Sequence, residues 1–213
     1  QGRDLRGQLT LSNELMGLYR KLGREEDAMT FVARALELLP RAEEPDSVTA
    51  GTTWLNVATV YKAFGRPAEA LPYYEKARQV YEARLSAEDP RRGGLYNNMA
   101  LALTDLGRFS EARAAYAQAL EVMAHAPHGA WEQAITELNL ADLAAAEQGL
   151  LEGEGEIEDR LDRAWTLLDC PRADWNGYYA FVCEKCAPSF TYFGRFADGE
   201  ALKQRAEEIY AGA

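Results

Sequence analysis

Two cysteines and two histidines are the residues of this 213-residue chain whose types and spacing could support metal or redox chemistry. Cys183 and Cys186 form a Cys-x-x-Cys pair, and His125 and His128 form a His-x-x-His pair. Such pairs can supply half of a zinc site, and two nearby thiols can also act as a redox pair. However, the two pairs are separated by more than 42 residues, the length of the repeat described below. The cysteines also stand at positions that apolar residues occupy in other copies of that repeat. We therefore expect buried, inert thiols and neither a metal nor another cofactor.

Catalytic groups are scarce in the rest of the sequence. The two histidines share one segment next to Pro127, which leaves no nucleophile paired with a base. There is no glycine-rich phosphate loop that follows a strand. Acidic runs such as Glu25–Asp27 fall at expected helix starts, where negative charge favours the helix dipole. We expect that the protein is not an enzyme.

Three asparagines recur at a nearly constant interval. Asn56, Asn98 and Asn139 are 42 and 41 positions apart, and each precedes an alanine by two residues. Two helical steps rotate a side chain by about 200°, so each amide points away from the face that its alanine packs. An amide offers donors and an acceptor that can hold the backbone of an extended peptide. The alternative is that the amides bond to one another or to helix carbonyls and stiffen the array.

Five further side chains share this candidate peptide-binding face by helical phase. Asn13 and Asn97 stand one position earlier in their helices, and the remaining three are Thr59, Lys62 and Asp142.

The elements that must carry these side chains are pairs of short amphipathic helices joined by tight turns. The clearest copy runs from Gly94 to Leu120 and turns at residues 106–108. The same pattern returns when the frame is moved back 42 positions to Gly65, and once more to Gly23. A unit that recurs at a fixed period buries its apolar face only by stacking on its neighbours. The expected helices of the first two pairs are Gln8–Leu22, Glu25–Leu39, Val48–Phe64 and Pro67–Leu85.

Prolines and capping residues mark the ends of these pairs. Pro40 and Pro45 are expected to end the first pair, and Asp46 or Ser47 can cap the next helix. Small residues recur at fixed places, where only a small side chain fits between closely crossing helices. Tyr74 and Tyr116 are expected to fill the wider gaps beside them.

This recurring set of residues resembles the tetratricopeptide repeat. The set is Ala58, Tyr61, Gly65, Ala70, Tyr74 and Ala77, repeated as Ala100, Leu103, Gly107, Ala112, Tyr116 and Ala119. The period of 42 is longer than the usual 34 and, with the acid-proline linkers, is similar to the kinesin-light-chain type. The resemblance implies an all-α, right-handed superhelical solenoid of about five antiparallel helix hairpins. It also implies that the asparagines line the inner wall.

One repeat domain, residues 1–213, is expected. Its five units are expected at about 9–42, 51–84, 93–125, 134–170 and 175–211. The fourth contains an acidic, glycine-rich insertion that we expect to be exposed. In the fifth, Pro188 is expected to kink the first helix. Its aromatic residues are expected to form the core: Trp175, Tyr178, Tyr179, Phe181, Phe190, Tyr192 and Phe193.

Composition excludes several classes of partner. The formal net charge of −11 opposes a phosphate backbone, which argues against nucleic acid. No apolar run reaches the roughly 20 residues of a membrane span, so no membrane association is expected. Three cysteines are too few for a disulfide framework, and a reducing, cytoplasmic location is expected. Because the chain begins at Gln1, a segment upstream can have been lost.

The sequence therefore predicts a non-enzymatic protein-interaction scaffold that binds a peptide or an extended protein segment. Two alternatives stay open: self-association into a homodimer through the exposed ends of the array, and a peptide-sensing regulatory domain whose effector module lies upstream. A thiol redox enzyme is the least favoured class.

Overall fold

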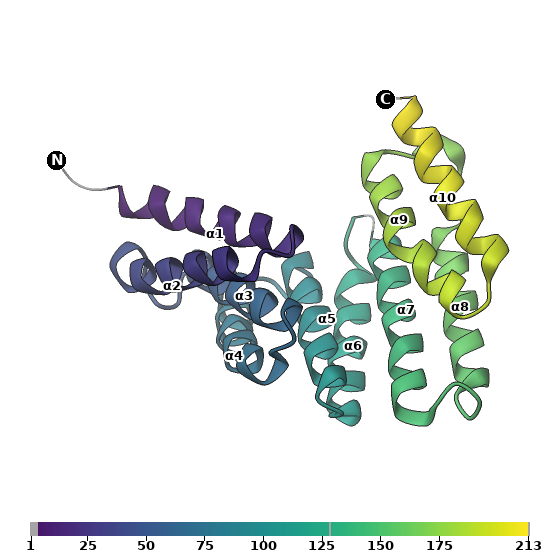
Figure 1. Ribbon diagram of the computed structural model, residues 1–213, viewed down its shortest axis with the longest axis horizontal. Coiled ribbons are helices and arrows are strands. Elements are labelled where there is room, and N and C mark those ends of the chain that lie inside the picture. Colours follow the sequence, from purple (N-terminus) through teal and green to yellow (C-terminus); the bar gives the residue numbers. More distant parts are fainter. Residues whose placement is uncertain (1–3, 128, 213) are drawn as a thin grey trace. The chain divides into compact units, whose positions relative to one another are not determined.

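Ten α-helices and one short 3₁₀ turn make up the computed structural model over the residues that it describes, 4–127 and 129–212 (Figure 1). The helices are α1 (Leu5–Lys21), α2 (Glu25–Ala42), α3 (Val48–Ala63), α4 (Pro67–Arg84), α5 (Pro90–Asp105), α6 (Phe109–Met123), α7 (Gly129–Gln148), α8 (Glu154–Leu168), α9 (Gly177–Tyr192) and α10 (Phe196–Ala211), and the 3₁₀ turn η1 is Arg172–Asp174. The predicted all-α fold of successive helix hairpins is confirmed. None of the described helices is long and apolar enough to cross a membrane.

A glycine in the left-handed region ends the first helix of every hairpin. Gly65, for example, has φ of +72°, and the next N–H, of Arg66, donates to the Tyr61 carbonyl at 2.9 Å. This bond satisfies a carbonyl that the helix end would leave without a partner. The other four turn glycines, also at positive φ, are Gly23, Gly107, Gly149 and Gly194.

An arginine follows the glycine in four of these turns and begins the second helix with an ion pair. Arg66 contacts Glu69 three residues later, with 2.6 Å between Nε and Oε1. The carboxylate thereby lies in the first turn of the helix, where the helix dipole favours it. The matching pairs are Arg24–Asp27, Arg108–Glu111 and Arg195–Asp198.

Helix ends of the first two pairs lie within one residue of the expected ones except at two places: α1 begins at Leu5, three residues before Gln8, and α2 continues past Pro40. Ser47 caps α3, since its hydroxyl accepts from the Ala50 N–H at 3.1 Å. Pro40 was expected to end α2, and this was wrong because α2 continues to Ala42. Pro188 lies inside α9, which continues to Tyr192. A proline near a helix end removes a single hydrogen bond, and packing of the remaining turn can offset that cost.

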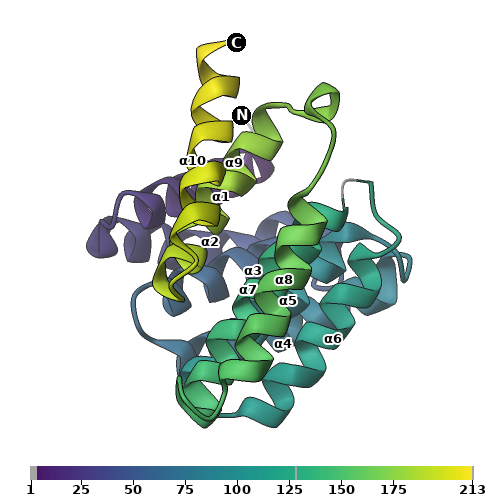
Figure 2. The ribbon, with the colours of Figure 1, turned by 90° about the vertical axis from the view of Figure 1, so that its right-hand side faces the viewer.

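The chain consists of two compact units. The first ends at Ala115, and the second begins at Tyr116. In the first unit, α1 packs on α2, α3 packs on α4, and first helices of neighbouring hairpins also touch. In the second unit, α7 packs on α8 and α9, and α9 packs on α10; both views show these pairs side by side (Figures 1 and 2). A single domain over residues 1–213 stays a prediction.

Small and large side chains alternate in the cores as expected. Ala58 and Ala70 are fully buried in one cluster with Tyr74, which has no exposed surface. The other alanines of the repeated set, Ala77, Ala100, Ala112 and Ala119, are also fully buried. Close helix crossings therefore depend on alanine at these positions.

Candidate functional site

The first helices of the hairpins in the first unit each carry half-buried asparagines on one side, which is called the polar face below. Helix α1 contacts α3, and α3 contacts α5. Asn13, Asn56 and Asn98 lie on these three helices and are all half-buried. Their neighbours on the packing side, Ala58 and Ala100, are fully buried. Asn56 and Asn98 are thus less buried than the alanines two positions later, and their role in binding stays a prediction.

Asn13 and Asn56 bond to each other across two helices. The Asn56 amide nitrogen donates to the Asn13 side-chain oxygen at 3.4 Å. The Asn13 amide nitrogen in turn donates to the hydroxyl of Thr53, a buried residue of α3, at 3.0 Å. This network corresponds to the alternative in which the amides bond to one another. It also fixes the orientation of both amides before any ligand arrives.

Asn98 and Thr59 bond to carbonyls of their own helices. The Asn98 amide nitrogen donates to the Gly94 carbonyl at 2.9 Å, and the Thr59 hydroxyl donates to the Leu55 carbonyl at 2.8 Å. Both are bonds to the residue four positions earlier, a common solution for polar side chains within helices. An asparagine amide can take part in about four hydrogen bonds, so one such bond uses only part of its capacity. Asn97, the residue before Asn98, is also half-buried.

Lys62 and Asp105 connect α3 with α5 on the same polar face. The Lys62 ammonium lies 3.4 Å from an Asp105 carboxylate oxygen, and their side chains are 28% and 43% exposed. An ion pair at this level of exposure contributes little to stability, on the order of 1 kcal/mol or less. Both charges are therefore available to a ligand at small cost.

Asn139 and Asp142 belong to α7 in the second unit, so each unit carries its own part of the candidate set. Asn139 is half-buried, and Asp142 is exposed. Although solvent reaches the Asp142 carboxylate, the protein around it disfavours the charged form and raises its pKa to about 6. A cation brought close by a ligand would lower this pKa again.

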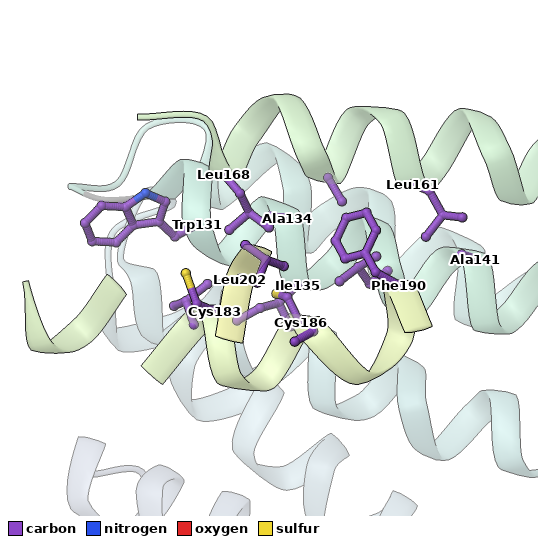
Figure 3. Packing of buried hydrophobic residues seen from close by; sticks show 14 of the residues in the cluster. Trp131, Ala134, Ile135, Ala141, Leu161, Leu168, Cys183, Cys186, Phe190 and Leu202 are labelled. Carbon is purple, nitrogen blue, oxygen red and sulfur yellow. The ribbon is translucent and has the colours of Figure 1, made fainter. Parts of the chain in front are cut away.

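Cys183 and Cys186 lie in the hydrophobic core of the second unit (Figure 3). They are 0% and 1% exposed and pack among apolar side chains such as Ile135 and Leu202. Burial raises the pKa of Cys183 to about 11 and that of Cys186 to about 12. A thiol that keeps its proton is a poor nucleophile and a poor metal ligand, because the thiolate is the reactive form.

Potential metal ligands do not gather among the residues that the structure describes. In residues 4–127 and 129–212, no group of three or more His, Cys, Asp or Glu side chains could hold a metal ion. His125 is exposed. The second half of the His-x-x-His pair, His128, lies outside the described residues.

An aromatic surface on α9 was not anticipated from the sequence. Tyr179 and Phe190 are buried as expected, but Tyr178, Phe181 and Tyr192 are 40%, 51% and 69% exposed. The assignment of all seven aromatics to the core was therefore wrong for these three. Positions 178, 181 and 192 share one helical face, so a phase argument applied to α9 would have separated them.

Glu132 of α7 and Tyr178 of α9 are joined by a hydrogen bond within this aromatic surface. The Tyr178 hydroxyl donates to the Glu132 carboxylate, and the Tyr178 ring lies 5.8 Å from the Trp131 ring. Burial raises the pKa of Glu132, while Lys185 opposes this shift. Glu132 lies about two helical turns before Asn139 on α7.

Models of two sequence families match the chain, and both are described as tetratricopeptide repeat. One matches residues 8–83 and the other residues 94–125, which together amount to half of the chain. No curated protein sequence matches significantly.

Solved structures similar to this chain share its fold at low sequence identity. Nearly identical TPR-like repeats assigned to a kinesin light chain of Podosopora anserina align over 100% of this chain and 98% of theirs, with 16% identity and a TM-score of 0.65. BtubC (BKLC) from P. vanneervenii aligns over 99% and 92%, with 18% identity and a TM-score of 0.55. A Rap protein complexed with Competence and Sporulation Factor aligns over 96% of this chain but 52% of its own, with 18% identity and a TM-score of 0.57.

Proposed function

Because the chain belongs to the tetratricopeptide repeat family, we propose that it is a non-enzymatic interaction module that binds an extended segment of a protein partner. The segment lies along the polar face of α1, α3 and α5 in the first unit, with Asn56 and Asn98 as its main contacts, and Asn139 on α7 is a separate candidate contact of the second unit. The observation that carries this proposal is the contact of α1, α3 and α5 in chain order, which sets half-buried amides side by side.

Amide side chains suit a ligand that is recognised through its backbone. An extended peptide exposes N–H and C=O groups at regular intervals, and an asparagine can accept from one and donate to the other. The bonds of Asn13 to Thr53 and to Asn56 hold these amides in place. Less side-chain entropy is then lost when a ligand binds.

Charged side chains beside the amides add selectivity for the ligand's own side chains. Lys62 and Asp105 can each exchange their mutual ion pair for a charge of the ligand. Asp142 and Glu132 favour a cationic group in the second unit, because such a group would stabilise their charged forms. Thr59, Asn13 and Asn97 complete the proposed contact surface.

The test is peptide binding by amide variants. Peptides selected from a displayed library of short unstructured sequences would be measured by calorimetry against Asn56→Ala/Asn98→Ala and against Asn139→Ala. We expect each variant to weaken binding by about tenfold, which corresponds to roughly 1.4 kcal/mol. Gln79→Ala, on the exposed side of α4, is the matched control and should bind as the parent does. Unchanged affinity in both amide variants would exclude this face as the binding surface.

A peptide-sensing regulatory domain is the second candidate. The observation in its favour is the similarity in fold to a Rap protein in complex with its factor, whose length this chain spans by about half. A peptide that binds this chain alone but changes the activity of a longer form of the protein would support this alternative.

The net charge of the chain argues against two classes of partner. A net charge of −11 repels nucleic acid and anionic lipid surfaces, so neither is proposed as a ligand. The proposed cytoplasmic location rests on the small number of cysteines.

A further inference from the structure

Four leucines form an apolar stripe along α1 and its C-cap residue, Leu22. Leu11, Leu18 and Leu22 are 57%, 48% and 59% exposed, and Leu15 between them is half-buried. At 100° per residue these four side chains fall within an arc of about 60°. They face away from the core side of α1, where Leu9 and Met16 are buried. Large aliphatic residues concentrated on one exposed face indicate an interaction surface.

The same register is largely buried in the next two hairpins of the first unit. Moved forward by 42 positions, Leu11, Leu15 and Leu18 become Thr53, Val57 and Val60. These three residues of α3 are 0%, 0% and 1% exposed. Val57 and Val60 belong to the core cluster that α1 and α2 build.

In α5 the register is occupied by Leu95, Met99 and Ala102; Leu95 and Ala102 have no exposed surface, and Met99 is half-buried. They pack in the cluster of α4 residues such as Tyr74 and Val80. The leucine face of α1 therefore has the shape and chemistry that receives another helix in this fold. Helix α1 is the first described helix, and Figure 1 shows the following helices of its unit on one side of it.

The last helix does not offer a complementary apolar surface. We align α10 with α2 on the turn glycines that precede them, Gly194 and Gly23. In this alignment Met29, Val32 and Leu36 of α2 correspond to positions 200, 203 and 207 of α10. These are occupied by exposed charged residues: Glu200, Lys203 and Glu207. Head-to-tail stacking of two chains would place leucines on these charges and desolvate them without partners.

The leucine stripe instead complements itself. The intervals between Leu11, Leu15, Leu18 and Leu22 are 4, 3 and 4 residues, which read the same in both directions. Two copies of α1 that cross antiparallel therefore place Leu11 opposite the partner's Leu22, and Leu15 opposite the partner's Leu18. An interface of this kind has two-fold symmetry and closes on itself.

Charge along one edge of the stripe favours the same arrangement. Glu14 and Lys21 are exposed and lie on the same flank of the leucines. In an antiparallel pair related by a two-fold axis, each flank of α1 lies beside the same flank of the partner's α1. Glu14 then lies about 3 Å along the axis from the partner's Lys21, within reach of both side chains. Opposite charges at such flanking positions set the orientation of paired helices.

From this self-complementarity we propose that the leucine face of α1 binds a second copy of this chain as an antiparallel two-fold dimer. The leucine face is distinct from the polar face that carries Asn13, which lies roughly opposite on the same helix. Dimer formation and peptide binding can therefore succeed or fail separately.

The first experiment measures the mass of the protein by light scattering and sedimentation equilibrium at micromolar concentration. The parent chain should have twice the chain mass, and Leu18→Glu should have the mass of one chain. Because Leu18 is exposed in the single chain, this substitution should leave helicity unchanged, and thermal stability should fall only by the contribution that dimerisation makes. A parent that stays monomeric in this range would overturn the proposal. A longer form of the protein that is monomeric because a segment upstream of Gln1 covers α1 would overturn it as well.

Charge exchange tests the register of the dimer without touching the leucines. Glu14→Lys and Lys21→Glu should each weaken the homodimer by about tenfold or more at low salt, because each brings like charges together. A mixture of these two single variants should form a heterodimer, and Glu14→Lys/Lys21→Glu should recover the affinity of the parent. Lys203→Glu on α10 makes the same charge change as Lys21→Glu and should leave the affinity of the homodimer unchanged. Equal affinities for all of these variants would exclude the antiparallel register.

Discussion

Cys183 and Cys186 show, at the residue scale, how burial decides what a reactive side chain can do. Their spacing suits a redox pair, yet both thiols are enclosed in the core of the second unit. Burial disfavours the thiolate, and the pKa values near 11 and 12 follow. Cys170, in the segment after α8, is half-buried and lies beside the core.

Alkylation rates provide a prediction for these thiols. At pH 8 the thiolate fraction of Cys183 and Cys186 should be at least about 100-fold lower than that of an ordinary cysteine. Iodoacetamide should therefore modify Cys170 first, and the other two only after denaturant unfolds the protein. Mass spectrometry of tryptic peptides after timed quenching measures the three rates. Rates for Cys183 and Cys186 that are equal in the native and unfolded protein would contradict their assignment to the core.

The asparagines differ from the cysteines in that their roles in structure and binding coexist. Asn13 connects α1 to α3, and Asn98 bonds within α5. Each bond is worth about 1 kcal/mol to the folded state. The remaining hydrogen-bonding capacity supports the proposed contact with a ligand backbone.

At the scale of elements, the turn between paired helices is the most regular feature of the chain. A glycine at positive φ ends the first helix, and in four hairpins an arginine and an acid three residues later begin the second. The conformation of Gly65 and the Arg66 bond to the Tyr61 carbonyl define the direction in which the chain returns. The hairpin geometry is therefore encoded locally.

Substitution of Gly65 by alanine measures the contribution of this turn. No heavy atom lies within 4 Å of a Cβ at this position, so the penalty comes from the left-handed backbone alone. We expect Gly65→Ala to lower the free energy of unfolding by about 1 to 2 kcal/mol.

Gly94 provides the matched control for this substitution. It lies inside α5 without a positive φ, and a Cβ there also meets nothing within 4 Å. Gly94→Ala should stabilise the protein by roughly 0.5 to 1 kcal/mol, because alanine loses less backbone entropy on folding. Denaturant titrations of both variants measure these changes. The same sign of change in both would contradict the role assigned to the turn.

At the scale of the whole molecule, the chain consists of two compact units. In repeat proteins each unit contacts mainly its neighbours, so stability is nearly a sum of local terms. Unfolding of one unit ahead of the other is then expected, and a two-state analysis applies to each unit by itself and not to the whole chain.

Hydrogen exchange of core variants tests whether the units open separately. Tyr74→Ala removes a fully buried ring from the first unit and should lower the opening free energy of α3 and α4 by about 3 to 5 kcal/mol. Amides of α9 and α10 should change much less. Phe190→Ala, which empties a buried site in the second unit, should produce the opposite pattern. Equal loss of protection in all these helices would instead favour the single domain predicted from the sequence.

The sequence by itself determined the helix pairs, their turns and the alanine packing positions. These features are local or periodic: Gly65 needs a left-handed backbone, and Ala58 and Ala100 recur because equivalent crossings leave equal space. The family resemblance rested on the same residues, and the matched models confirm it.

Only the tertiary structure decided which polar and aromatic groups have partners. The bond between Asn13 and Thr53 joins residues 40 positions apart, and no local rule predicts it. Exposure of Phe181 and of the leucines on α1 depends on which helices pack against them. Helical phase assigns a side chain to a face, whereas burial of that face depends on neighbours that are distant in the sequence.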